Sequence, residues 1–274
     1  MADGTGWERS RRVHFDGIVE LYDKVRWDYP SELYDDIFMY SGEGKRALEI
    51  GAGTGRATVP FLDAGFDVTA VELGGNMTAF LIKKFKEHTN FKVINSTFED
   101  VAFDSDNSFD VIYAASAFHW IDAEIGCPKV YRLLKNGGAF VLFRNNFQPS
   151  DGDSLYEDIQ AEYEKHYNTY YTNSKRPIKQ SHDDFWKPSE LYRSFRFNGM
   201  ELYGFREITM KLYDCTQTYT ADEYIALMDT YSDNRALPKE NRAKLYAGVR
   251  KAIIKHGGNY KYKCIFQLYM GRKP

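Results

Sequence analysis

A cluster of glycines directly after a short apolar segment is the feature of this sequence best suited to chemistry. Residues 46–50 form an apolar run that stops at the sequence Gly-Ala-Gly-Thr-Gly, residues 51–55. Glycine at a strand-to-helix turn lets the main chain approach a ligand without a collision from a Cβ atom. The run therefore predicts that a nucleotide-like cofactor binds where this strand ends.

The residues around the glycines distinguish between two classes of cofactor. A dinucleotide fingerprint has glycine or alanine three positions after its second glycine, where this chain has Arg56. Glu49 precedes the glycines, and its charge suits the cationic sulfonium and ammonium of S-adenosylmethionine better than an anionic pyrophosphate. The alternative is that Glu49 is a strand-end acid that caps nearby amides. Glu72 ends the next apolar segment, where a carboxylate can accept from the ribose hydroxyls of either cofactor.

Alternating strands and helices must hold these residues in place. Continuous apolar runs predict strands at 46–50, 66–71, 91–94, 109–114, 139–144 and 263–270, and an alternating pattern predicts another at 207–213. Three- and four-residue periodicity predicts helices at 15–25, 32–40, 54–64, 76–86 and 123–134, with a further start at a capping box, 220–223. We expect a kink at Pro60 and a turn at 136–138. Strand–helix alternation from about 46 to 144 indicates a parallel sheet with helices on both faces.

The character of the chain changes after residue 146, where a polar, tyrosine-rich stretch begins. We therefore expect four parts. They are an N-terminal helical segment covering the cofactor site (1–45), a cofactor-binding core (46–146), an inserted cap that selects the substrate (147–206), and the strands and helices that complete the core (207–274).

Composition excludes several classes of protein. With 36 basic and 39 acidic residues the net charge is −3, which gives no global sign of a nucleic-acid partner. The three cysteines are widely spaced, which argues against a disulfide scaffold or a Cys-x-x-Cys metal site. Residues 1–12 do not resemble a signal peptide, and no apolar run approaches the ~18 residues of a membrane span. We expect a soluble cytoplasmic protein without a metal or a membrane partner; the oligomeric state is not predicted.

Five sequence blocks in matching order resemble the class I S-adenosylmethionine-dependent methyltransferases. More narrowly, they resemble the small-molecule branch that includes trans-aconitate methyltransferase-like (methyltransferase type 11) proteins. The blocks are 48–55, 70–72, 97–99, 109–112 and 117–120. The resemblance implies an α/β, Rossmann-like sheet of seven mostly parallel strands in the order 3-2-1-4-5-7-6. The seventh strand would be antiparallel, helices would cover both faces, and a helical cap would follow strand 5.

The same resemblance implies a set of cofactor-binding residues. Glu72 would hold the ribose, Leu73 and Met77 would flank the adenine, residues 97–99 would border its edge, and Arg26 could pair with the carboxylate. The full set is Tyr22, Arg26, Glu49, Gly51, Ala52, Gly53, Thr54, Gly55, Glu72, Leu73, Met77, Thr97, Phe98, Glu99 and Ala115.

Methyl transfer from a sulfonium is an in-line displacement that leaves S-adenosylhomocysteine, so the protein must mainly align the acceptor and exclude water. His119 is the candidate general base, and its alternative role is to orient or pack beside Trp120. Trp120, Tyr29 and Trp186 are candidate substrate contacts. The aromatic residues of the insert would line an acceptor pocket or form the core of a cap.

The leading interpretation is a methyltransferase that acts on oxygen, nitrogen or carbon of a small molecule. The first alternative is a protein or RNA methyltransferase, although residues 114–118 lack the Asn/Asp-Pro-Pro-aromatic motif of base-amino methylation. A nicotinamide-dependent oxidoreductase is disfavoured by Glu49 and Arg56. A cofactor-binding protein without catalysis also remains open.

Overall fold

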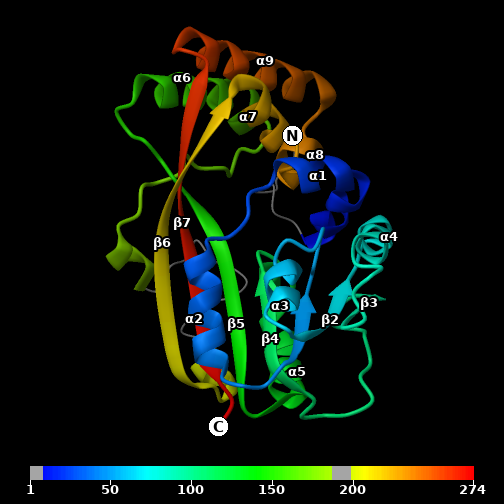
Figure 1. The fold of residues 1–274 in the computed structure, drawn as a ribbon. Coiled ribbons are helices and arrows are strands. Elements are labelled where there is room, and N and C mark those ends of the chain that lie inside the picture. Colours follow the sequence, from blue (N-terminus) through cyan, green and yellow to red (C-terminus); the bar gives the residue numbers. More distant parts are fainter. Residues whose placement is uncertain (1–8, 187–198) are drawn as a thin grey trace. The chain divides into compact units, whose positions relative to one another are not determined.

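The computed structural model describes residues 9–186 and 199–274 (Figure 1). The chain forms two compact units, each assembled from three separate stretches. Unit 1 comprises Met1–Arg26, Asn146–Ser181 and Asp214–Ile265, and unit 2 comprises Trp27–Asn145, His182–Tyr213 and Phe266–Pro274.

A seven-stranded sheet has the predicted order, β3-β2-β1-β4-β5-β7-β6. Parallel pairing joins β2 to β3, β1 to β2, β1 to β4, and β4 to β5. The strands are β1 (Arg46–Ile50), β2 (Asp67–Glu72), β3 (Phe91–Asn95), β4 (Phe109–Ala115), β5 (Leu134–Gln148), β6 (Arg206–Thr220) and β7 (Asn259–Arg272).

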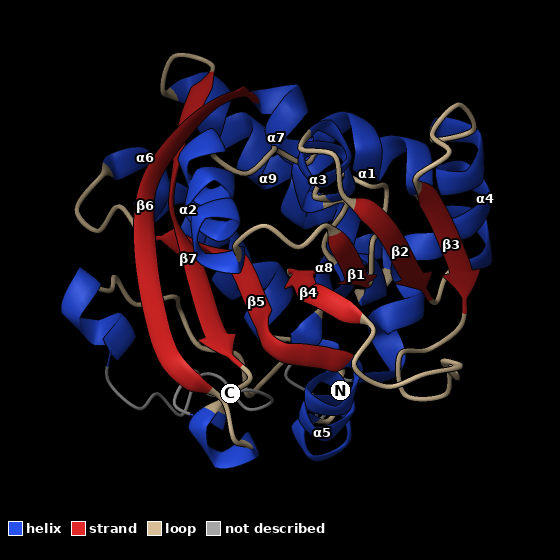
Figure 2. Ribbon diagram, turned by 60° about the horizontal axis from the view of Figure 1, so that its bottom comes forward, coloured by secondary structure: helices blue, strands red, loops and turns tan. Residues whose placement is uncertain are grey.

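Strand β7 runs antiparallel to β5, as two contacts in unit 2 demonstrate. The amide of Gly137 donates to the carbonyl of Lys273 over 2.7 Å. Further along β5, Nε of Arg144 donates to Oε1 of Gln267 over 3.1 Å. The partner number falls as the β5 number rises, so the sheet is mixed, as predicted (Figure 2).

Helices around the sheet bury the apolar faces of unit 2, with α3 against β2, and α4 against β2 and β3. Leu33 and Ile37 of α2, Phe61 of α3 and Leu48 of β1 are fully buried. The helical elements are α2 (Ser31–Ser41), α3 (Thr58–Asp63), α4 (Gly75–Lys84), η2 (Phe118–Trp120), α5 (Ala123–Leu133), η4 (His182–Trp186) and η6 (Glu201–Tyr203).

Two local predictions in unit 2 were wrong. Helix α3 begins at Thr58 rather than at residue 54, so Pro60 lies in its first turn. An amide there has no intrahelical acceptor, and a proline therefore causes no kink. The turn expected at 136–138 is instead an irregularity within β5, because the pairing partner shifts from Leu134 to Ala139.

Unit 1 is largely helical. Helix α6 packs against α9 and η3, α7 packs against α9 and α1, and α8 packs against η1. The capping box predicted at the start of α7 is present, with Thr220 and Glu223 exchanging hydrogen bonds. Its helical elements are η1 (Arg9–Gly17), α1 (Val19–Val25), α6 (Ser154–Tyr163), the π-helical turn η3 (Glu164–Asn168), α7 (Ala221–Met228), α8 (Ser232–Ala236) and α9 (Lys239–Lys255).

Tyrosines of the polar stretch form part of the core of unit 1. Tyr156 and Tyr171 are fully buried. The hydroxyl of Tyr167 donates to Oδ2 of Asp233 over 2.6 Å, and that of Tyr171 donates to the Asp233 carbonyl over 2.9 Å. These bonds attach η3 and the residues after it to α8. The helix predicted at 15–25 is interrupted, because η1 ends at Gly17 and α1 begins at Val19.

Candidate active site

The glycine turn after β1 has a backbone that only glycine adopts readily. The φ angles of Gly51, Gly53 and Gly55 are +71°, +58° and +79°. A Cβ on Gly51 would lie 2.6 Å from the Cβ of Ala117, so packing also requires this glycine. A Cβ on Gly53 would meet no described atom within 4 Å. The turn is therefore packed behind Gly51 and open at Gly53, which suits close approach by a ligand.

Glu72, at the carboxyl end of β2, is oriented by two amides. Its Oε2 accepts from the amide of Gly53 over 2.8 Å, and its Oε1 accepts from the amide of Gly74 over 2.8 Å. The residue is 9% exposed. A carboxylate oxygen has two acceptor sites, so an oxygen that accepts from an amide can also accept from a ligand hydroxyl. Glu72 thus joins the glycine turn to the turn before α4 and presents a fixed acceptor pair.

Glu49 lies in a different environment. Its Oε2 accepts from Oγ1 of Thr58 over 2.5 Å and from the hydroxyl of Tyr113 over 3.0 Å. Its Oε1 is buried and accepts no hydrogen bond from any described residue. Burial raises the pKa of Glu49 to about 8. The donors that meet Glu49 are hydroxyls rather than the amides of the capping alternative, and a nearby cation would favour its ionised form.

Residues that follow β2 and β3 lie at the same carboxyl-terminal edge of the parallel strands as Glu72. Met77 is buried on α4. Asn95 donates from Nδ2 to the carbonyls of Glu72 and Leu73, each over 2.9 Å. Oγ1 of Thr97 donates to Oδ2 of Asp100 over 2.6 Å and accepts from the Asp100 amide over 3.0 Å. The Thr97 hydroxyl therefore closes the turn that follows β3.

The end of β4 contains a strained residue that the sequence did not reveal. Ser116 follows Ala115 and has a φ of +52°, which is uncommon for a residue other than glycine. Its Oγ lies 2.9 Å from the hydroxyl of Tyr29. The ring of Tyr29 packs edge-on against Phe143, with 4.7 Å between centroids. Such strain concentrates at functional sites, and the serine type alone gives no signal of it.

His119 and Trp120 lie in η2, three and four residues after that serine. Their ring centroids are 4.9 Å apart. Burial, together with the positive charge of Arg144, lowers the pKa of His119 to about 4. The imidazole is therefore neutral at physiological pH, so it can accept a proton but is a weak base.

The structure assigns most of the predicted site residues to unit 2, whereas Tyr22 and Arg26 belong to unit 1. Arg26 donates to the carbonyl of Thr230 over 3.1 Å, and its guanidinium lies over the rings of Tyr22 and Tyr231, at 4.9 and 4.6 Å. Trp186 ends η4, and its side chain lies outside the described residues.

Arg56, the residue that argued against a dinucleotide, donates to Oδ1 of Asp28 over 2.5 Å. Within 9–186 and 199–274, no group of three or more histidine, cysteine or acidic side chains is placed to hold a metal ion. No helix in this part of the chain is both long and apolar enough to cross a membrane.

Residues 48–142 match a family described as a methyltransferase domain. A Staphylococcus carnosus methyltransferase is 30% identical over 185 residues, which are 62% of this chain and 83% of that protein. A Mycobacterium tuberculosis methyltransferase is 32% identical over 137 residues, 50% of this chain. The match spans 54% of that relative, so the chain spans about half its length.

Two solved structures have the same fold. One, from Anaeromyxobacter dehalogenans and described provisionally as a type II methyltransferase, gives a TM-score of 0.60 at 18% identity, over 90% of this chain and 97% of that one. The other is phosphoethanolamine N-methyltransferase 2 of Haemonchus contortus, in complex with phosphomonomethylethanolamine and S-adenosylhomocysteine. It gives a TM-score of 0.53 at 14% identity, over 94% of this chain and 57% of that one.

Proposed function

The chain belongs to the class I S-adenosylmethionine-dependent methyltransferases, and we propose that it transfers a methyl group from S-adenosylmethionine to a small-molecule acceptor. The observation that best supports binding of this cofactor is the carboxylate of Glu72. Two main-chain amides fix its oxygens beside Gly53, where an added Cβ would meet no described atom within 4 Å. The proposal of a small-molecule acceptor rests on the resemblance of the sequence blocks to the small-molecule branch of the family.

The buried polar atoms around the glycine turn fit this cofactor. Oε1 of Glu49 and Oγ1 of Thr54 are each buried without a hydrogen bond from the described part of the chain. Buried polar groups normally have partners, and an ammonium group of the ligand would supply donors here. Glu72 would hold the ribose hydroxyls, with Leu73 and Met77 beside the adenine.

When bound, the cofactor supplies a methyl group already activated on a sulfonium. The task of the protein is then to orient the acceptor and exclude water. Tyr29, Ser116 and His119 are the side chains we assign to the acceptor side, because they lie at or just beyond the end of β4 or contact it. The low pKa of His119 favours an acceptor that is already nucleophilic at neutral pH, such as a carboxylate, over one that needs a strong base.

A screen of small-molecule acceptors tests this function. The protein is incubated with S-adenosylmethionine and pools of carboxylates, amines, phenols and alcohols, and separately with protein and RNA pools. Formation of S-adenosylhomocysteine is measured against a no-acceptor blank. We expect turnover with a pool that contains small carboxylates. Turnover only with protein or RNA substrates would contradict the small-molecule assignment.

A further inference from the structure

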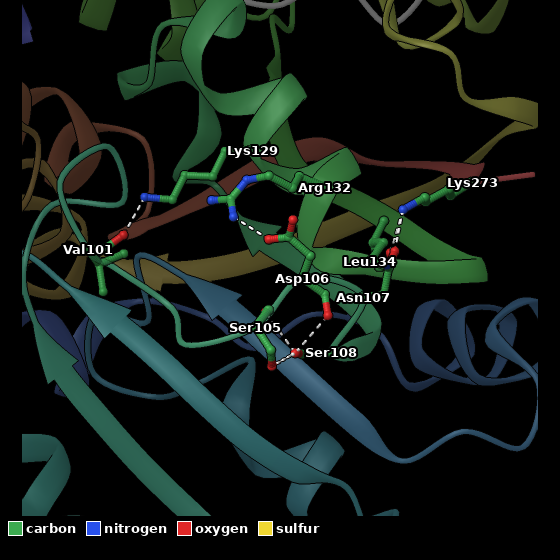
Figure 3. A network of polar contacts seen from close by, with 9 residues as sticks. All are labelled: Val101, Ser105, Asp106, Asn107, Ser108, Lys129, Arg132, Leu134 and Lys273. Atoms are coloured by element: carbon green, nitrogen blue, oxygen red, sulfur yellow. Dashed lines mark hydrogen bonds and ion pairs between the residues drawn. The ribbon is translucent and has the colours of Figure 1, made fainter.

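Lys129, on α5, contacts the main chain of the turn after β3. Its Nζ donates to the carbonyl oxygens of Phe98, Glu99 and Val101 over 2.7, 3.1 and 2.5 Å. Figure 3 shows the lysine reaching from α5 to Val101. One ammonium therefore binds three main-chain carbonyls within four consecutive residues, which uses all three of its donors.

This contact fixes the direction in which the peptide groups of the turn point. In a trans peptide the carbonyl and the following N–H point to opposite sides. The carbonyls of Phe98 and Glu99 are directed at Lys129, so the amides of Glu99 and Asp100 are directed away from it. The Asp100 amide accordingly donates to Oγ1 of Thr97.

The turn lies at the same edge of the sheet as the ribose-binding carboxylate we propose. Strands β2 and β3 are parallel, and Glu72 pairs with Asn95, two residues before Thr97. The ammonium of Lys129 also lies 5.1 Å from the centre of the Phe98 ring, so the lysine holds both main chain and side chain of this residue.

We infer that Lys129 is a positioning residue for adenine recognition, which it secures by orienting the peptide between Phe98 and Glu99 so that the Glu99 amide is directed toward the cofactor. This inference rests on the proposed function. It assigns the lysine no contact with the reacting atoms. Partial burial of the ammonium lowers the pKa of Lys129, as expected for a charge that is bound mainly by neutral carbonyls.

The test compares two ligands that differ only at the base, S-adenosylhomocysteine and S-inosylhomocysteine, by titration calorimetry. Lys129→Met keeps the apolar stem and removes the ammonium. The matched control is Lys135→Met, which removes a lysine that pairs with the side chain of Asp110 over 2.7 Å. We expect Lys129→Met to bind S-adenosylhomocysteine about tenfold more weakly, as for loss of charge-assisted hydrogen bonds. It should also discriminate less between the two ligands, while Lys135→Met matches the wild type.

Each other outcome has a defined meaning. Equal weakening toward both ligands, or unchanged affinity, would overturn the inference, as would a wild type that does not distinguish them. A wild type that binds neither ligand would contradict the proposed function itself. If Lys129→Met does not fold, Lys129→Arg keeps the charge, but its planar group cannot direct one nitrogen at three carbonyls. The arginine variant should lose discrimination in the same direction, and full discrimination in it would overturn the inference.

Discussion

At the scale of single residues, the two carboxylates beside the glycine turn accept hydrogen bonds from different kinds of donor. Glu72 accepts from two amides, whereas Glu49 accepts from two hydroxyls and has a buried second oxygen. The sequence predicted both acids from their places at strand ends. It could not predict the hydroxyl donors Thr58 and Tyr113, because α3 and β4 bring them to Glu49 only in the folded protein.

The raised pKa of Glu49 predicts proton release on cofactor binding. With a folded pKa of about 8, the carboxyl is mostly protonated at pH 7, and a bound cation would favour ionisation. Binding of S-adenosylmethionine should therefore release close to one proton from the protein at pH 7. The number released should fall as the pH rises through the folded pKa, because Glu49 is then already ionised before binding. Calorimetry in buffers of different ionisation enthalpy measures this number.

Glu49→Gln is the control for that measurement, because it keeps the shape of the side chain and cannot ionise. It should bind without the pH-dependent release. In the free protein, burial of the ionised Glu49 costs stability as pH rises from the ordinary carboxyl pKa through 8, so the variant should gain stability relative to wild type at pH 9. Equal proton release in the two proteins would rule out Glu49 as the titrating group.

At the scale of elements, the sequence predicted the strands that carry the site better than those beyond it. Strand β1 has its predicted bounds, β3 and β4 each extend one residue further, and β2 is shifted by one residue at both ends. Strand β5 was expected at 139–144 and extends over Leu134–Gln148. Its ends contain Gly137, Gly138, Asn145 and Asn146, which are poor strand formers, so pairing with neighbours decides their structure.

Ser116 gives an element-scale prediction about strain at the end of β4. Its φ of +52° costs a residue with a Cβ ~1 kcal/mol that glycine does not incur. Both Ser116→Ala and Ser116→Gly lose the hydroxyl contact with Tyr29, so their difference isolates the backbone term. We expect the glycine variant to be more stable than the alanine variant by about 1 kcal/mol in denaturant unfolding.

Ser96 provides the matched control, because it is not among the residues of positive φ. There the order should reverse, with alanine more stable than glycine, since glycine loses more backbone entropy on folding. An alanine variant more stable than the glycine variant at both positions would show that Ser116 is not strained.

At the scale of the whole molecule, the family and the order of the sheet followed from the sequence. The five blocks that carry the resemblance all lie within 48–120, whereas unit 1 is built from three stretches outside that region. The same tyrosines that were candidates for an acceptor pocket include buried core residues of unit 1. Neither side-chain type nor periodicity distinguishes those two roles, which is why the acceptor remains a proposal.

The central claim is that the glycine turn binds S-adenosylmethionine, and titration calorimetry tests it most directly. The wild type should bind S-adenosylmethionine and S-adenosylhomocysteine and should not bind NADH. Glu72→Ala should weaken both sulfur ligands by ~1–3 kcal/mol, the cost of unpaired polar groups. The control Asp67→Ala, at the exposed start of the same strand, should leave affinity unchanged. Binding of NADH without either sulfur ligand, or a Glu72→Ala variant with wild-type affinity, would contradict the account.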